Sequence, residues 1–271
     1  MRILSTIVAA VIAFCVNGFV KIPEEPSVKP TGKKYFTLSF DDGITQDYRI
    51  IEICKKHNFK GITFNINSGL CGENWEWVAD MIGKPGTTHQ RLTKEEIKSG
   101  AYDGFDVAVH GYEHSSAKNF DNNPLGLWFE YERDALKIKR LTGNYPVGMA
   151  YPGGDTEFTE KSKENLKKYT TIKYARGTTS TYGFDFPDDY LEWQPTCSIL
   201  DDRLFELAEE FLKDDGENKL FYVWGHGYEL DAFDKYGELG QLIKMMTENS
   251  SVVCVSNTEF YLLYKDVIPS A

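Results

Sequence analysis

The stretch that decides the fold is Tyr35-Phe-Thr-Leu-Ser-Phe-Asp41-Asp42-Gly43. Its first six residues, YFTLSF, form a short β-like run that ends in two carboxylates and a glycine. An amphipathic helical pattern over residues 45–57 comes next, and a second strand-like run, GITFNI, covers 61–66. A strand, helix and strand joined by short connections are typical of a parallel sheet.

The same alternation continues along the chain. Strands are predicted at 105–109, 147–151, 171–175, 220–224 and 252–255, and helices at 125–142, 157–168, 202–212 and 239–247. Thr93 and Glu96 have the spacing of a capping box, and Gly143 is well placed to end the helix before it. About seven strands in roughly 230 residues favour an α/β barrel closed by helices, with a doubly wound open sheet as the alternative.

Composition narrows the class of protein and of partner. The 271 residues, 41% apolar and 26% charged, suit one large globular domain and exclude disordered and low-complexity classes. There are 41 acidic and 30 basic residues, for a formal charge of -11. Such a surface repels phosphate backbones, so nucleic acid is excluded as a partner and uncharged substrates fit better.

The N-terminal segment predicts export. An apolar run from Ile3 to Val16 follows one positive charge and is too short to span a bilayer, which takes about 20 apolar residues. We therefore expect a signal peptide over 1–18, a proline-containing linker over 19–33, one globular domain over 34–271, and a secreted protein without a membrane anchor after cleavage. An uncleaved anchor and a buried first strand are the alternatives.

Four cysteines remain after the predicted cleavage. They are Cys54, Cys71, Cys197 and Cys254. An oxidising compartment permits disulfides among them, with three complete pairings open, and free buried thiols are the alternative. No C-x-x-C pair occurs, so a thiolate zinc site is unsupported.

Chemistry-bearing residues gather where the predicted strands end. They are Asp41, Asp42, His110, His114 and His226. In α/β folds the carboxyl edge of the sheet is where active sites lie. One carboxylate and two histidines can bind zinc, while a second carboxylate and a separate histidine can accept and donate protons. Spacing alone therefore suggests metal-assisted hydrolysis of an acyl or phosphoryl bond.

Each of these signals has an ordinary structural alternative. Asp-Asp-Gly is a common turn, and the two imidazoles of H-x-x-x-H, which would share one face of a helical turn, also occur on solvated helices. His57 fits the end of a helix and His89 a polar loop, so neither is given a role.

Three motifs taken together resemble the polysaccharide deacetylase family (NodB homology, carbohydrate esterase family 4). They are Leu38–Gly43, His110–His114 and Trp224–His226, and the similarity spans roughly 34–265. The resemblance implies a distorted, incomplete (β/α) barrel that removes acetyl groups from N-acetylated or O-acetylated sugars. It implies further that Asp41 is the general base, that Asp42, His110 and His114 hold the metal, and that His226 is the general acid. A backbone N–H beside Tyr151 would help to stabilise the oxyanion.

Two motifs depart from the family. The third usually carries an arginine shortly before its proline, but residues 150–154 read Ala-Tyr-Pro-Gly-Gly. We expect Arg176, just past the next predicted strand, to supply the missing cation; an exposed surface arginine is the alternative. The fourth motif pairs an acid with a tryptophan, which Glu192 and Trp193 could fill, with Asp188 and Asp189 as competitors and a core role as the alternative for Trp193.

The resulting prediction is a secreted, metal-dependent carbohydrate deacetylase. Zinc is the expected metal, although cobalt, manganese and nickel accept the same ligands. The expected partner is an acetylated polysaccharide or oligosaccharide, and Tyr151 is the aromatic side chain chosen to contact it. Trp224 stands where a smaller residue is usual and would narrow the acetyl pocket. A non-catalytic sugar-binding protein and a deacylase of a small amidated molecule are the alternatives.

Overall fold

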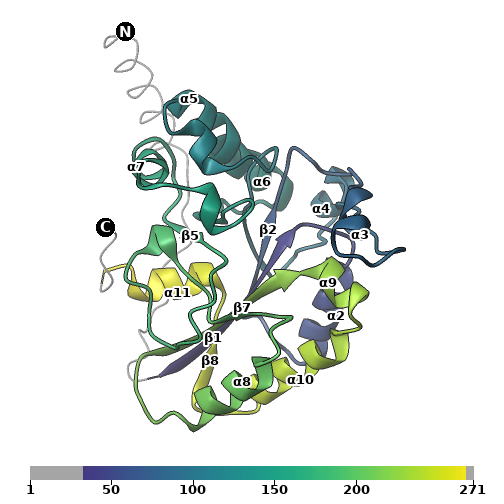
Figure 1. Cartoon of the computed structure of the whole chain (residues 1–271), viewed down its shortest axis with the longest axis vertical. Helices are drawn as coiled ribbons and strands as arrows, with labels where there is room; N and C mark the ends of the chain where they lie inside the picture. The colour runs from purple at the N-terminus through teal and green to yellow at the C-terminus, as the bar shows by residue number, and fades with distance from the viewer. Residues whose placement is uncertain (1–32, 267–271) are drawn as a thin grey trace.

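The structure, a computed structural model, describes residues 33–266. Its centre is a parallel sheet with strand order β5-β4-β3-β2-β1-β7-β6, and β8 pairs with the beginning of β1. The strands are β1 Lys34–Asp42, β2 Ile62–Ile66, β3 Asp106–Val109, β4 Gly148–Ala150, β5 Tyr174–Arg176, β6 Cys197–Ser198, β7 Lys219–His226 and β8 Val252–Cys254. The sheet curls into a half-barrel (Figure 1), which confirms the predicted distorted (β/α) barrel.

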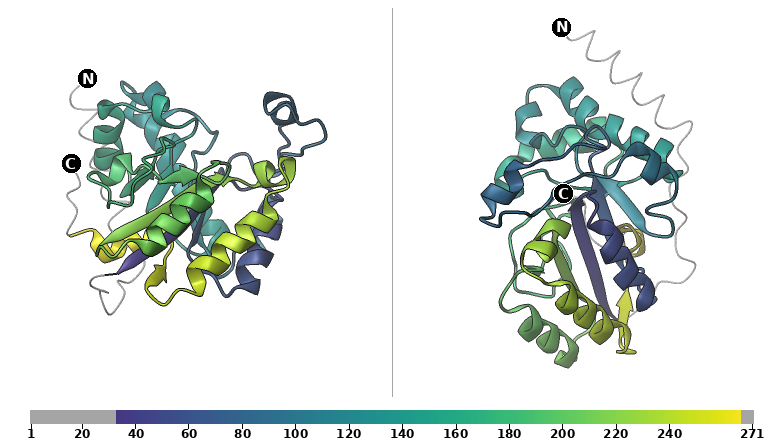
Figure 2. Two further views of the ribbon diagram at one scale, coloured as in Figure 1. Left: turned by 60° about the horizontal axis from the view of Figure 1, so that its bottom comes forward. Right: turned by 90° about the vertical axis from the view of Figure 1, so that its right-hand side faces the viewer.

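Helices surround this sheet. They are α2 Asp47–Lys56, α3 Trp77–Met81, α4 Lys94–Lys98, α5 Pro124–Leu127, α6 Arg133–Thr142, α7 Glu160–Tyr169, α8 Leu204–Lys213, α9 Gly227–Ala232, α10 Tyr236–Thr247 and α11 Asn257–Tyr264. Helices α2, α10 and α8 lie side by side along one flank, and α5, α6 and α7 cover the other end (Figures 1 and 2). The segment around α3 projects from the body (Figure 2, left).

Strand β1 is the middle of the core. All nine of its residues are buried, the pattern expected of a parallel strand covered on both faces. Phe36, Leu38 and Phe40 belong to one apolar cluster that also contains Phe64 and Val109 from the neighbouring strands. The predicted helix signals hold as well: the Thr93–Glu96 capping box forms, and Gly143 ends α6 in the left-handed region at φ 84°.

Strands β1 and β7 are longer than predicted. Asp41 and Asp42 are the last residues of β1 and His226 is the last residue of β7, because β1 pairs with β2 up to Asp42 and with β7 up to Asp41. In this register Asp41 faces Asn65 on β2 and His226 on β7. Strand β6 and helix α9 lie outside the predicted elements, and a π-helical turn, Trp128–Glu132, interrupts the helix predicted over 125–142.

Some predictions concern the ends of the chain and the cysteines. The predicted signal segment 1–18 and residues 19–32 of the predicted linker lie outside the described residues. Within 33–266, every helix is too short or too polar to cross a bilayer. Cys54, Cys71, Cys197 and Cys254 are free thiols, the alternative to disulfides, and burial raises the pKa of Cys54 and Cys197 to about 12.

Candidate active site

The ends of β1 and β7 bring three of the predicted residues together. Asp41 and Asp42 are 2% and 5% exposed, and His226 Nε2 lies 3.9 Å from Asp41 Oδ2 and 4.0 Å from Asp42 Oδ2. Asp42 and Gly43 both have positive φ, 81° and 65°. A Cβ on residue 43 would lie 2.8 Å from Ile66 Cγ2, so the bend needs glycine. This bend turns the Asp42 side chain toward the loop that follows β3.

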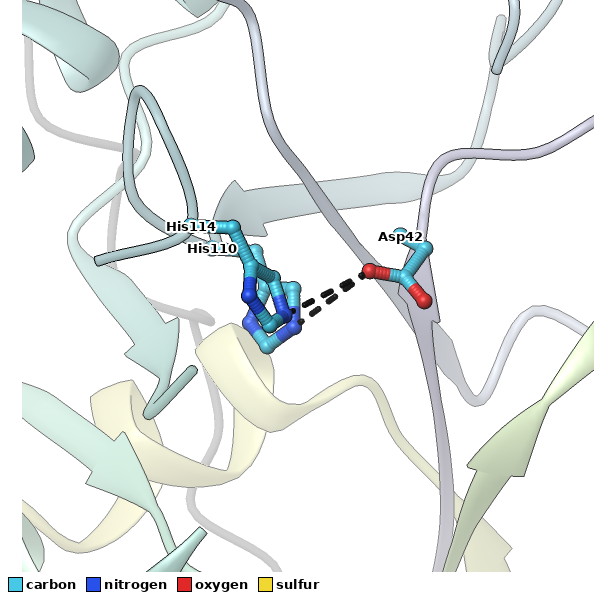
Figure 3. Close-up of side chains that lie close together, drawn as sticks. All are labelled: Asp42, His110 and His114. Atoms are coloured by element: carbon cyan, nitrogen blue, oxygen red, sulfur yellow. Dashed lines mark ion pairs between the residues drawn. The ribbon is translucent and has the colours of Figure 1, made fainter. Parts of the chain in front are cut away.

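That loop carries the two histidines of the second motif. The His110 main-chain N–H donates to Ile66 O (3.0 Å), and His110 Nδ1 lies 3.0 Å from Ala150 O, which places the proton on Nδ1 and leaves Nε2 as a free acceptor. His114 has φ 56°, so the motif forms an irregular loop, and the loop, not one face of a helical turn, brings the two imidazoles together. Both Nε2 atoms lie 3.7 Å from Asp42 Oδ1 (Figure 3).

Glu130, on the π-helical turn, supports this loop. Its Oε1 accepts the N–H groups of Glu113 (3.0 Å) and Ser115 (2.9 Å), and its main-chain oxygen accepts that of Tyr112 (2.8 Å). A Cβ at Gly111 would lie 2.6 Å from Glu130 Oε1. The loop conformation therefore depends on a carboxylate 17 residues downstream of it, which no local sequence pattern singles out.

The donor set of Asp42, His110 and His114 fits a divalent metal. One ligand atom from each lies within 4.8 Å of the others, and Figure 3 shows the three side chains pointing toward one another. Two ligands of a tetrahedral zinc ion, each about 2.1 Å from it, are about 3.4 Å apart, close to the 3.7 Å that separates Oδ1 from each Nε2. Burial and the neighbouring imidazole of His110 lower the pKa of His114 to about 3, so it is neutral as a ligand must be.

Asp41 is held by two other strands. Its Oδ1 accepts a hydrogen bond from Asn65 Nδ2 (2.8 Å), and its Oδ2 forms an ion pair with the Arg176 guanidinium. Burial raises the pKa of Asp41, but the charges of Arg176, His110 and His226 outweigh this effect, so that the pKa lies below its ordinary value. Asp41 is thus ionised at neutral pH.

Arg176 reaches Asp41 from strand β5. It is the last residue of β5 and is fully buried, where the sequence suggested a position just past the strand and an exposed arginine as the alternative. Its register partner on β4 is Ala150, within the Ala-Tyr-Pro-Gly-Gly motif that lacks arginine. The guanidinium therefore enters the site from the strand beside that motif.

His226 pairs with Glu229, one turn further on in α9. Glu229 Oε2 accepts the main-chain N–H of His226 (2.8 Å), and its Oε1 lies 3.4 Å from His226 Nδ1. Burial lowers the pKa of His226, but the charge of Glu229 and those of Asp42 and Asp41 raise it to about 9. His226 is thus protonated at neutral pH, and Glu229 is a residue of the site that the sequence analysis missed.

The predicted acid next to a tryptophan lies elsewhere. Glu192 points outward, where its carboxylate pairs with Lys163 Nζ at 2.7 Å, and it has no contact with His226 among the described residues. Asp189, one of its competitors, pairs with the same lysine at 3.1 Å. Trp193 is fully buried and packs edge-on against Tyr222, so the core role given as its alternative is the one observed.

Tyr151 does not face a substrate. It is 1% exposed, its ring stacks on Phe158 with centroids 4.1 Å apart, and its hydroxyl donates to Leu191 O. The main-chain N–H of Tyr151 itself donates to Arg176 O (3.0 Å) and is therefore occupied. Trp224 lies closer to the candidate site than Tyr151 does. The centroid of its ring is 5.5 Å from that of His226 and 4.6 Å from the Arg176 guanidinium.

Two further residues missed by the sequence analysis contact Asp42. His89 Nε2 lies 2.9 Å from Asp42 Oδ2, and Arg91 Nη2 lies 3.3 Å from Asp42 Oδ1. Both side chains are 1% exposed, although His89 had been placed in a polar loop without a role. Burial raises the pKa of Asp42, but the hydrogen bond with His89 and the charges of His226, His110 and His114 outweigh this effect and hold the pKa well below its ordinary value.

Comparison with known proteins identifies a family and a similar fold. The profile of the polysaccharide deacetylase family matches residues 28–174, more than half of the chain. A Mycobacterium smegmatis protein described as a polysaccharide deacetylase has a similar fold, with 14% identity and a TM-score of 0.57, over 93% of this chain and 98% of its own. A family 4 acetyl xylan esterase from Clostridium thermocellum, solved with a cobalt ion, has 16% identity and a TM-score of 0.51, over 87% and 93%.

No curated protein matches the chain. The two solved structures are distant in sequence and support the fold, while the family itself follows from the match over residues 28–174, which contains the first two motifs. The chain therefore belongs to the polysaccharide deacetylase family.

Proposed function

We propose that this protein is a metal-dependent deacetylase that hydrolyses the acetyl amide or ester of an acetylated carbohydrate, with zinc as the expected metal. The observation that carries the proposal is the convergence of five side chains from three strand ends: a ligand set of Asp42, His110 and His114, with Asp41 and His226 beside it. The family supports the hydrolase class.

The side chains have complementary proton-transfer roles. A divalent ion held by Asp42, His110 and His114 would supply Lewis-acid chemistry toward the acetyl carbonyl and lower the pKa of water. Asp41, ionised beside Arg176, accepts the proton of the attacking water. His226, protonated beside Glu229, donates a proton to the departing amine or hydroxyl. The products are acetate and the deacetylated sugar.

Arg176 favours catalysis over sugar binding alone. The absence of an arginine from the third motif was the one sequence feature that pointed to a non-catalytic binder. The Arg176 guanidinium is buried beside Asp41. This supports the view that Arg176, on β5, supplies the positive charge that the third motif lacks. The role of Arg176 is therefore included in the proposal.

The surface near the site supports a sugar substrate. Trp75 contacts His114 edge-on, with centroids 5.3 Å apart, and lies 5.4 Å from Trp77, which is 53% exposed. Aromatic faces suit the apolar faces of sugar rings. Trp77 replaces the buried Tyr151 as the proposed contact. The proposal also includes secretion, which rests on the apolar run 3–16 of the sequence.

Acetate release tests the proposal directly. Chitin oligomers, peptidoglycan fragments and acetylated xylan are each incubated with the protein, with and without EDTA and with zinc restored. We expect release from at least one substrate, loss with EDTA and recovery with zinc, and at least about a 100-fold loss in Asp41→Asn. Sugar binding without any release would instead identify a binding protein, and release unaffected by EDTA and by His114→Ala would refute metal dependence.

A further inference from the structure

The carboxylate of Asp42 has a different partner for each of its oxygens. Oδ1 faces the two imidazoles of the metal site, whereas Oδ2 lies 2.9 Å from His89 Nε2. We propose that His89 is a positioning residue that holds Oδ2 so that Oδ1 is presented to the metal. This inference rests on the metal site proposed above.

Aromatic packing fixes the His89 ring. Trp75 stacks on it nearly parallel, with centroids 5.5 Å apart and planes 10° apart, and Tyr228 contacts it at 5.4 Å. Trp75 also carries the Arg91 guanidinium, 3.7 Å from its ring centroid, and Arg91 reaches the other carboxylate oxygen of Asp42. Trp75 therefore packs against both His89 and Arg91, the two residues whose polar groups contact Asp42.

The main chain fixes the same segment. Residues 90–92 run antiparallel to 43–45, the residues that follow Asp42: the Thr45 N–H donates to Gln90 O (2.8 Å), and the Leu92 N–H donates to Gly43 O (2.9 Å). His89 thus enters the site on backbone that is hydrogen-bonded directly to the bend after Asp42. The distance between its ring and the carboxylate is set by this pairing.

The local chemistry favours a positioning role over simple packing. With Nε2–H donating to Asp42, the other ring nitrogen, Nδ1, has no hydrogen-bond partner among the described residues. An apolar side chain would fill the space between Trp75 and Tyr228 without leaving a buried nitrogen unpaired. Hydrogen bonds to metal-binding carboxylates orient them, and loss of such a partner typically weakens metal binding 10- to 100-fold.

Metal affinity tests this role without any enzyme assay. The full chain is stripped of metal, and its dissociation constant for zinc is measured at pH 7.5 by competition with a chromophoric chelator. We expect His89→Ala to raise that constant about 10- to 100-fold. His89→Gln, whose side-chain N–H can reach the place of Nε2, should restore it to within about threefold of wild type. His57→Ala, at the end of α2, is the matched control and should leave it unchanged.

The outcomes separate this inference from the proposed function. His89→Ala and His89→Gln both binding zinc within twofold of wild type would overturn the positioning role while leaving the metal site intact. His89→Gln binding as weakly as His89→Ala would overturn it too, since the donated hydrogen bond would then not be what matters. Wild type binding no zinc, or His114→Ala binding it equally well, would refute the metal site itself and this inference with it.

Discussion

Replacing Arg176 with methionine tests whether the buried guanidinium stabilises Asp41. Both partners of this ion pair are almost inaccessible, with side-chain exposures of 0% and 3%. Methionine fills most of the space but leaves an uncompensated carboxylate, which typically costs about 3–5 kcal/mol when one partner of a buried pair is removed. An exposed pair provides the scale: Lys213→Met, which removes the partner of Glu209, should cost no more than about 0.5 kcal/mol.

The assay is urea unfolding of the metal-free protein, so that loss of metal cannot contribute to the change. Asp41→Asn and the double variant Asp41→Asn/Arg176→Met complete a double-mutant cycle. The double variant buries no unpaired charge at these two positions, so we expect it to be at least about 1 kcal/mol more stable than the sum of the single changes predicts. Burial raises the pKa of Asp41, and the charge of Arg176 opposes that effect. The pKa of Asp41 should therefore rise in Arg176→Met, and the acid limb of the pH–activity profile should move to higher pH.

Additive effects would refute this reasoning. If Arg176→Met costs less than about 1 kcal/mol and the cycle shows no coupling, the guanidinium does not interact with Asp41 in solution. Activity then gives an independent check, because a base that needs no partner would keep its turnover number in Arg176→Met.

Three further predictions concern the acid, the sugar surface and a buried carboxyl group. Glu229→Gln removes the charge that raises the pKa of His226, so the alkaline limb of kcat/KM against pH should move to lower pH; an unmoved limb would exclude this pairing. Trp77→Ala should raise KM for an acetylated oligosaccharide about five- to tenfold without changing hydrolysis of 4-nitrophenyl acetate, whereas Tyr182→Ala, an equally exposed aromatic, should change neither. Burial raises the pKa of Asp134 from 3.8 to about 7, so the folded protein holds this proton more tightly than the unfolded chain does. The resulting contribution to the free energy of unfolding is present in full below pH 3.8 and is lost as the pH rises toward 7. Asp134→Asn should therefore raise the free energy of unfolding by up to about 4 kcal/mol at pH 8 and by less than about 1 kcal/mol at pH 4, measured by urea unfolding; an equal change at both values would contradict it.

Much of the fold followed from local patterns. The buried β1 run, the amphipathic helix after it and the stop at Gly143 are all short-range signals, and each lies where predicted. Strand ends were less predictable, because Asp41 and Asp42 look like a turn until the partners on both sides continue the ladder. Strand β6 consists of two residues, Cys197–Ser198, and depends on pairing with β7, which no local pattern reveals.

The residues of the candidate site also fall into a group that the sequence predicted and a group that it did not. The residues in the recognisable motifs converge in the structure, since parallel strands end at one edge of the sheet. The residues that hold them, Glu130, Glu229, His89 and Arg91, contact them through tertiary packing or a helix turn. For Glu229 one signal was available: an acid three residues after a strand end can cap the helix that begins there.

Asp41 and His226 are facing residues of adjacent parallel strands. In the proposed mechanism these two residues accept and donate the protons, so the spacing between them is fixed by the main-chain pairing of neighbouring strands. Trp77, by contrast, lies on a projecting segment outside the sheet. Under the proposed function, insertions and replacements in that segment would change the contact with the sugar while the spacing of Asp41 and His226 stays the same, so selectivity and chemistry would depend on separate parts of the chain.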